Sequence, residues 1–232
     1  MMIAVLNASK TFSSKLDVLT HIITQVAYQL RHQVAPAWDI VPPAMHFVHD
    51  SSLVPVGAYR LWVLDDPDTS GALGYHDVDP DGQPYGRVFC TPTLDDGGTI
   101  LSGPNSISCT ISHEAGETAL DPDVTAWSQL PNGDLEAFEL CDRVEAISYD
   151  HNGVALSDFL LPAAFRARDT DTQFDYMVQL TNARDIAPDG YRIIMSGGNV
   201  SQDFGSERAK AKFLASKAKA HPAGRTARRL AP

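Results

Sequence analysis

The residues best suited to chemistry are 113–117, which read His-Glu-Ala-Gly-Glu. On a helix, residues four apart share a face, so His113 and Glu117 can point at one ion while Glu114 lies about 100° around the axis, beside it. Zinc accepts imidazole nitrogen and carboxylate oxygen, and a zinc site that also holds water needs a third protein ligand. The spacing therefore predicts a zinc site with His113 and Glu117 as ligands and Glu114 as the base that takes a proton from the water.

The pattern H-E-x-x-E differs from the zinc-protease motif H-E-x-x-H by a carboxylate in place of the second histidine. The third ligand is expected in residues 135–145, where Glu139 and Asp142 are three apart and would share a face on a helical turn. Glu139 is the first choice, and Asp142 is either an alternative ligand or a carboxylate that orients His113. An amphipathic surface segment is the other interpretation. Two carboxylate ligands would cancel the charge of the ion, which predicts slow or narrowly specific hydrolysis.

A short strand is expected ahead of this helix, and it contains Gly74, Tyr75 and His76. Two small residues with an aromatic ring and an imidazole would suit a sheet edge that binds an extended peptide through main-chain hydrogen bonds. We therefore predict these three residues as substrate-binding. The alternative is that Gly71 and Gly74 mark a bend or bulge and that Tyr75 packs.

Two other metal sites fit parts of the sequence. Cys109, His113 and Cys141 could form a thiolate zinc site, although Glu114 and Glu117 would then have no role. Asp77, Asp79 and Asp81 alternate as in a calcium loop, but no matching glutamate follows, so a hydrophilic turn over residues 77–86 is favoured.

The helix that carries the motif is expected to begin at Ser106 or Asn105, either of which can cap it, and to bury a stripe of Ile107, Ile111 and Ala115. A second amphipathic helix is expected after Ser14 as its cap, with apolar residues at three- and four-residue spacing from Leu16 to Leu30. Short apolar runs at 3–6, 45–48, 58–64, 73–76 and 87–91 predict strands. The fold class is therefore α+β, with a mixed sheet of about four to five strands packed on the two helices.

Composition limits the range of functions. The chain has 232 residues, 44% hydrophobic and 20% charged, which is enough for one substantial core. No apolar run is long enough to span a bilayer and residues 1–12 do not resemble a signal peptide, so no membrane partner and a cytoplasmic location are expected. Three cysteines at no disulfide-rich spacing agree with a reducing compartment.

The charge is divided unevenly along the chain. The net charge is −11, yet the part from residue 207 onward has eight Lys or Arg against one acid, a net +7, and leaves −18 on residues 1–206. An acidic body disfavours nucleic acid as a partner except through the basic tail. Residues 206–220 are alanine-rich and predict a helix whose small apolar face needs a partner. We therefore divide the chain into a domain at 1–205 and a basic extension at 206–232.

Several of these motifs together resemble a group of phage and bacterial proteins with a metalloprotease-like core. The string S-H-E-x-x-E-x-x-x-D-P covers Ser112 to Pro122, and E-x-x-D-x-V-E covers Glu139 to Glu145. Trp127, Gly153-Val154, S-D-F-x-x-P at 157–162 and the segment 71–77 complete the likeness, which spans roughly residues 55–165. The resemblance implies a zincin-like domain, and Glu117 is the departure from true H-E-x-x-H enzymes.

Two functions follow from this reading. The first is a zinc-dependent peptidase that acts on a peptide or protein substrate. The alternative is a structural component of a phage particle, in which the motif is a degenerate or purely structural metal site and the C-terminal segment contacts neighbouring virion proteins. A water-filled coordination position would favour the enzyme, whereas a fourth protein ligand would favour the structural site.

Overall fold

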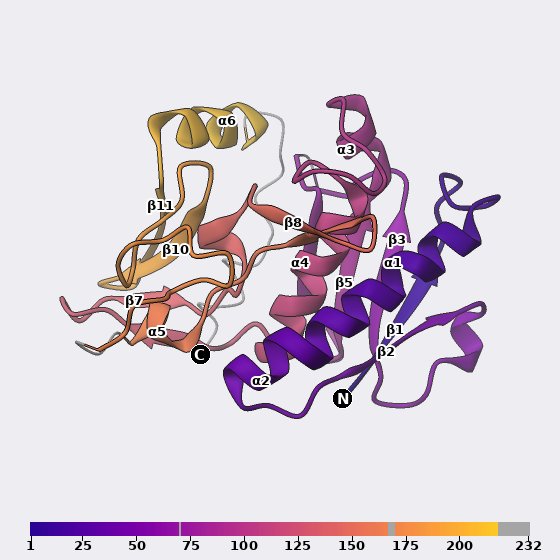
Figure 1. The fold of residues 1–232 in the computed structure, drawn as a ribbon, viewed down its shortest axis with the longest axis horizontal. Coiled ribbons are helices and arrows are strands. Elements are labelled where there is room, and N and C mark those ends of the chain that lie inside the picture. Colours follow the sequence, from indigo (N-terminus) through magenta and orange to yellow (C-terminus); the bar gives the residue numbers. More distant parts are fainter. Residues whose placement is uncertain (70, 167–169, 218–232) are drawn as a thin grey trace.

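The structure is a computed structural model that describes residues 1–232 except 70, 167–169 and 218–232 (Figure 1). Its helices are α1 (Leu16–Gln29), α2 (Ala35–Trp38), α3 (Cys90–Asp95), α4 (Ile107–Leu120), α5 (Pro162–Phe165) and α6 (Glu207–Lys217). A π-helical turn, η1 (Leu30–Val34), joins α1 to α2, and two 3-10 turns are η2 (Ser51–Leu53) and η3 (Asp142–Val144). The strands are β1 (Met2–Asn7), β2 (Ala44–Val48), β3 (Tyr59–Leu64), β4 (Gly74–Val78), β5 (Pro84–Phe89), β6 (Trp127–Gln129), β7 (Leu135–Ala137), β8 (Ser148–His151), β9 (Val154–Ser157), β10 (Tyr191–Ser196) and β11 (Asn199–Phe204).

A five-stranded mixed sheet in the order β2-β1-β3-β5-β4 forms one half of the molecule. Four strands are parallel, and β4 pairs antiparallel with β5 at the edge. β1 is apolar on both faces, with Ile3 to Leu6 all buried, as expected for a strand inside a parallel sheet. Helices α1 and α4 pack on this sheet (Figure 1). The predicted α+β class and the mixed sheet of four to five strands are confirmed.

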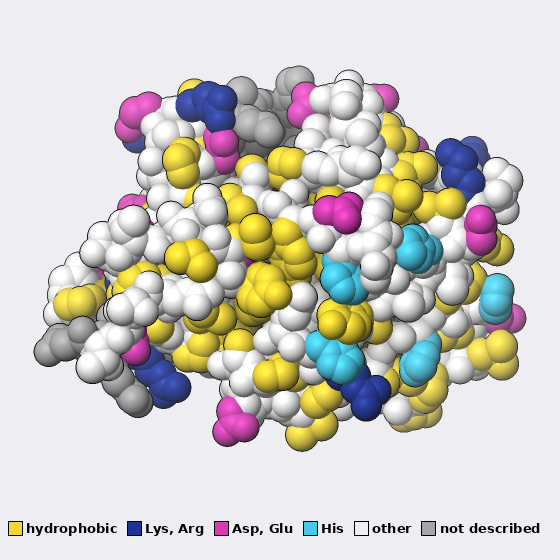
Figure 2. Space-filling view, viewed as in Figure 1, with side chains coloured by type: hydrophobic (Ala, Val, Ile, Leu, Met, Phe, Trp, Pro, Cys, Tyr) yellow, Lys and Arg dark blue, Asp and Glu magenta, His cyan; other side chains and the backbone are white. Residues whose placement is uncertain are grey.

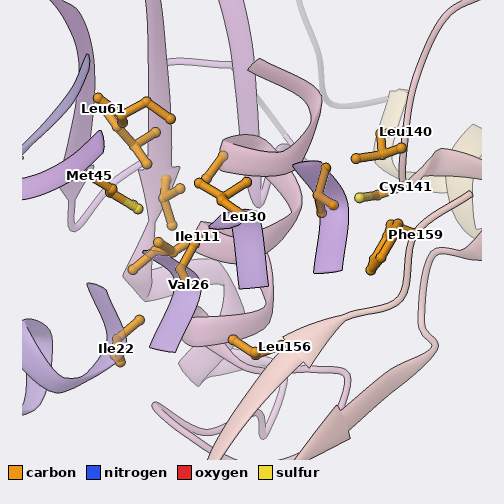
Figure 3. Close-up of a cluster of buried hydrophobic side chains, with 14 of the residues drawn as sticks. Ile22, Val26, Leu30, Met45, Leu61, Ile111, Leu140, Cys141, Leu156 and Phe159 are labelled. Carbon is orange, nitrogen blue, oxygen red and sulfur yellow. The ribbon is translucent and has the colours of Figure 1, made fainter. Parts of the chain in front are cut away.

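The main hydrophobic core lies between the sheet and these helices (Figure 3). Ile22, Val26 and Leu30 reach it from α1 and η1, and Ile111 reaches it from α4. The apolar stripes predicted from sequence are therefore buried, except at Leu16, which is half-buried. The predicted Ser14 cap is wrong: Lys15 is the N-cap and makes no side-chain cap bond. Ser14 instead lies in turns closed by the backbone bonds Ser13 N to Lys10 O and Lys15 N to Phe12 O.

The second half contains a four-stranded sheet in the order β11-β10-β7-β6 and the hairpin β8-β9. The buried Arg143 pairs with Glu136 of β7 at 3.1 Å, which fixes the segment after β7 against this sheet. After β11 the chain forms α6, which confirms the predicted helix as far as Lys217, and Arg208 pairs there with Asp189. The rest of the basic tail, 218–232, lies outside the described residues. No helix in the described part of the chain is long and apolar enough to cross a membrane.

Candidate metal centre

Helix α4 holds the H-E-x-x-E residues in a buried position. Ser106 is its N-cap, and the Ser106 hydroxyl accepts a hydrogen bond from Cys109 N at 3.2 Å, which confirms the predicted cap. Because the apolar stripe of α4 faces the core, the neighbouring face places Glu117 at 0% exposure and Glu114 at 3%. Two buried carboxylates on one helix are costly unless positive charge or hydrogen bonds compensate them.

His113 lies between two of the predicted ligands. Its Nε2 is 3.1 Å from Glu117 Oε1 and 3.2 Å from Asp142 Oδ1. Glu117 Oε1 also accepts a hydrogen bond from Cys141 N, so the segment that carries Asp142 is fixed against α4. This segment is a 3-10 turn, η3, where the spacing of Glu139 and Asp142 had suggested an ordinary helical turn. The structure therefore brings His113, Glu117 and Asp142 together.

His76 takes part in the same site. It is fully buried in β4, with its Nδ1 3.5 Å from Glu114 Oε2 and 3.4 Å from Glu117 Oε2, and its Nε2 3.8 Å from Glu139 Oε2. His76 was predicted to lie at a substrate-binding edge, whereas the structure places its ring among the carboxylates of α4 and Glu139. Strand alternation, which points Gly74 and His76 to one face, was the signal that could have indicated this role.

Gly74 and Tyr75 lie on opposite faces of β4. A Cβ on Gly74 would be 2.8 Å from Thr110 Cγ2 and 2.9 Å from Glu114 Oε1, so the absence of a side chain lets α4 approach the strand. The Tyr75 hydroxyl donates to Asp68, and Arg87 donates to the same hydroxyl. The structure thus brings Gly74 close to the site as a spacer and does not bring Tyr75 to it.

We refer to His76, His113, Glu114, Glu117, Glu139 and Asp142 as the His-carboxylate cluster. Two triads within it have donor atoms within 4.8 Å of one another: His76 with Glu117 and Glu139, and His113 with Glu114 and Glu117. Two ligands of a tetrahedral zinc ion, each about 2.0–2.1 Å from the metal, are about 3.3 Å apart. The separations of 3.1 to 3.8 Å between imidazole nitrogens and carboxylate oxygens are close to this value.

The cluster concentrates negative charge in a buried place. Burial, together with the neighbouring Glu117 and Glu139 carboxylates, raises the pKa of Asp142 to about 8 against the opposing effect of His113. Burial lowers the pKa of His113, but the Glu117 carboxylate and the hydrogen bond with Asp142 outweigh it and raise this pKa well above the usual range. Bound protons thus offset the negative charge of the cluster, which contains no Lys or Arg.

The two alternative metal sites receive no support from the geometry. Burial raises the pKa of Cys109 to about 12 and that of Cys141 well above its usual range, which disfavours thiolate ligands. Neither cysteine is in the triads found among the described residues. In the segment 77–86, Asp79 Oδ1 accepts hydrogen bonds from Asp81 N and Gln83 N, so it closes the hairpin between β4 and β5.

A second group of histidines lies on the surface. Figure 2 shows histidine side chains on the face that α1 crosses. Tyr28 stacks on His151 with ring centroids 4.4 Å apart and contacts His32 at 4.5 Å, while His21 is exposed and contacts Asn152 O. These histidines are separate from the His-carboxylate cluster.

The chain matches no protein-family model, no curated protein and no solved structure.

Proposed function

We propose that this protein binds a divalent cation, with zinc as the best fit, in the His-carboxylate cluster, and that the ion links β4, α4 and the segment 139–142. The observation that carries the proposal is the position of His76, which is fully buried and offers one ligand atom within 4.8 Å of carboxylate oxygens of Glu117 and Glu139, two residues from different segments of the chain. Imidazole and carboxylate are ligands that zinc accepts, and a buried histidine among carboxylates is a common arrangement for such an ion.

His76, Glu117 and Glu139 would hold this ion, and all three are almost fully buried. Glu114 Oε2, 3.5 Å from His76 Nδ1, is available as a fourth protein donor. Four protein donors and little solvent are typical of structural zinc sites, which stay closed and contribute directly to folding. The geometry therefore supports a structural role for the ion best, which is the second of the two functions expected from the sequence.

Metal analysis of the purified full chain tests this proposal. We expect zinc to copurify or to bind on addition, and His76→Gln and Glu139→Gln to lower zinc affinity by at least about tenfold, since removal of even an outer partner of a metal ligand costs about 10- to 100-fold. His21→Gln is the matched control because His21 is exposed and outside the cluster. A wild-type chain that binds no divalent cation, or a His76→Gln protein that binds zinc as tightly as wild type, would contradict the proposal.

A zinc-dependent peptidase is the second candidate, and the arrangement of β4 and α4 favours it. An H-E-x-x-E helix lies against a mixed sheet whose edge strand, β4, runs antiparallel to its neighbour. His113 keeps 14% of its side chain exposed, so solvent has its closest approach to the cluster there. A bound zinc ion would acidify a coordinated water. Glu114 would accept the proton and donate it to the leaving amine, and the exposed edge of β4 would bind the peptide.

Glu114→Gln distinguishes this enzyme from a structural site. Glutamine keeps the shape of the side chain and removes the proton acceptor, so a peptidase should retain its fold and zinc and lose about 10²- to 10⁴-fold in cleavage rate. The assay is zinc-dependent cleavage of a broad peptide library, with self-cleavage during storage as a second readout. Equal cleavage by wild type and Glu114→Gln, or no cleavage by wild type, would leave the structural site as the better account.

The resemblance to phage proteins supports one proposal about partners. On helix α6, Leu214 is exposed and Arg208 pairs with Asp189, and we propose that this helix contacts a neighbouring virion protein. The basic residues after 217 lie outside the described residues.

A further inference from the structure

We infer that the His-carboxylate cluster is a dinuclear site, in which a second divalent cation binds beside the first and the Glu117 carboxylate bridges the two. This inference rests on the proposed metal-binding function and goes beyond it in the number of ions and in the role of His113, Glu114 and Asp142.

The orientation of Glu117 is the first observation. Its Oε1 lies 3.1 Å from His113 Nε2, and its Oε2 lies 3.4 Å from His76 Nδ1, so each oxygen faces a different histidine. Glu117 is also the one residue shared by the two metal-compatible triads found in the described part of the chain. A carboxylate placed in this way can bind two ions at once, at the separation of about 3.5–4 Å that two-metal sites use.

The ligands divide into two sets around this bridge. The first ion takes His76, Glu139 and one Glu117 oxygen, as proposed above. The second takes His113, the other Glu117 oxygen and Glu114, which then no longer serves as the fourth donor to the first ion. Asp142 completes the second set: its Oδ1 lies 3.2 Å from His113 Nε2, whereas its Oδ2 is buried and has no hydrogen-bond partner among the described residues. Asp142 is 1% exposed, so water from the bulk does not satisfy this oxygen.

The donor set of the cluster points to the same number of ions. Four carboxylates and two imidazoles offer more ligands than the four that one tetrahedral zinc ion binds. Four carboxylates with two histidines are also the donor set that holds two ions in di-iron and di-manganese carboxylate proteins.

Native mass spectrometry of the full chain, titrated with Zn²⁺ and separately with Mn²⁺, tests the inference. We expect two ions per chain at saturation, and an electron paramagnetic resonance spectrum of the Mn²⁺ protein that shows two coupled ions. Asp142→Asn should lower the affinity of one site at least about tenfold and leave the other filled. Glu139→Gln should weaken the opposite site, and Glu117→Gln should weaken both. Asp123→Asn, an exposed carboxylate close to the end of α4, is the matched control and should bind two ions.

The outcomes separate this inference from the function on which it rests. One ion per wild-type chain at saturation, with an uncoupled Mn²⁺ spectrum, overturns the dinuclear site and keeps the proposed metal centre. No bound ion overturns both. The number of ions bound per wild-type chain decides between one ion and two even if a variant fails to fold. Circular dichroism would reveal such a failure.

Discussion

Removal of the metal should reverse the way in which the stability of this protein depends on pH. A ligand that binds only the folded state stabilises it by about 4.1 kcal/mol when its free concentration is 1,000 times its Kd. For a chain of 232 residues, 1 kcal/mol corresponds to about 2–4 °C in Tm. We therefore expect a chelator to lower Tm by about 8–16 °C at pH 7.5, relative to protein with zinc at that excess.

The pH dependence reverses because, when the metal is removed, protons bind to Asp142 and His113 in its place. In the metal-free fold the pKa of Asp142 is raised from 3.8 to about 8, chiefly by burial and then by Glu117. The folded state therefore binds this proton more tightly than the unfolded chain, so the resulting stability is complete below pH 3.8 and is lost as the pH rises to about 8. The raised pKa of His113 acts in the same direction above pH 6.5. One such proton changes the free energy of unfolding by at most about 1.4 kcal/mol per pH unit.

The metal-bound protein should behave in the opposite way. Protons compete with the ion for imidazole and carboxylate, so the affinity for metal, and with it the stability, increases as the pH rises toward 7.5. Asp158 also has a pKa raised to about 8, by burial and by Asp175, but it lies outside the cluster and contributes equally with and without metal. The difference between the stability curves with and without metal therefore reports on the His-carboxylate cluster alone.

Urea unfolding followed by circular dichroism at pH 5.5, 6.5 and 7.5, with zinc and with chelator, measures both curves. Asp142→Asn should flatten the chelated curve because asparagine does not titrate, whereas Asp158→Asn should alter both curves alike. Equal stability with zinc and with chelator, or curves that slope in the same direction, would refute this reasoning.

Three further changes have expected effects that follow from single contacts. Gly74→Ala should lower the free energy of unfolding by about 1–3 kcal/mol and weaken zinc binding, because the new methyl group meets Thr110 and Glu114; unchanged urea unfolding would contradict this. Ser106→Ala should cost about 1 kcal/mol by removal of the α4 cap, whereas the exposed Ser102→Ala should cost much less in the same assay. Deletion of residues 207–232 should leave Tm nearly unchanged, since Leu214 of α6 is exposed and the Arg208–Asp189 pair lies at the surface, and should abolish partner binding; a fall in Tm of several degrees would show that α6 belongs to the domain.

Local patterns in the sequence were sufficient for the helix that carries the motif. The Ser106 cap, the stripe of Ile107 and Ile111, and the four-residue spacing of His113 and Glu117 all depend on neighbours within one helix, and the structure has each of them in the predicted place. Helix α1 was predicted for the same reason. The start of α1 was not predicted correctly. Backbone hydrogen bonds in the preceding turn close that end of the helix, and the Ser14 side chain does not cap it.

The remaining parts of the site depend on contacts that spacing does not encode. His76 was predicted to face a substrate, since the strand alone does not reveal that α4 covers that face. The segment after β7 is short strand, bend and 3-10 turn, although the spacing of Glu139 and Asp142 had suggested a helical turn. Both carboxylates still reach the cluster, because the ion pair of Arg143 with Glu136 and the hydrogen bond from Cys141 N to Glu117 hold this segment in place.

The cluster is distributed over β4, α4 and the segment at 139–142, so the affinity for the proposed metal ion would report on folding of the whole domain. A binding-competent cluster exists only when the edge strand has paired with β5, α4 has docked on the core and the later segment has closed over both. The apparent Kd equals the intrinsic Kd divided by the fraction of chains in that state. A core substitution far from any ligand, such as one at Leu61 or Val26, would thus weaken metal binding once it depopulates the assembled state. During synthesis, the proposed metal centre cannot assemble before Glu139 has left the ribosome.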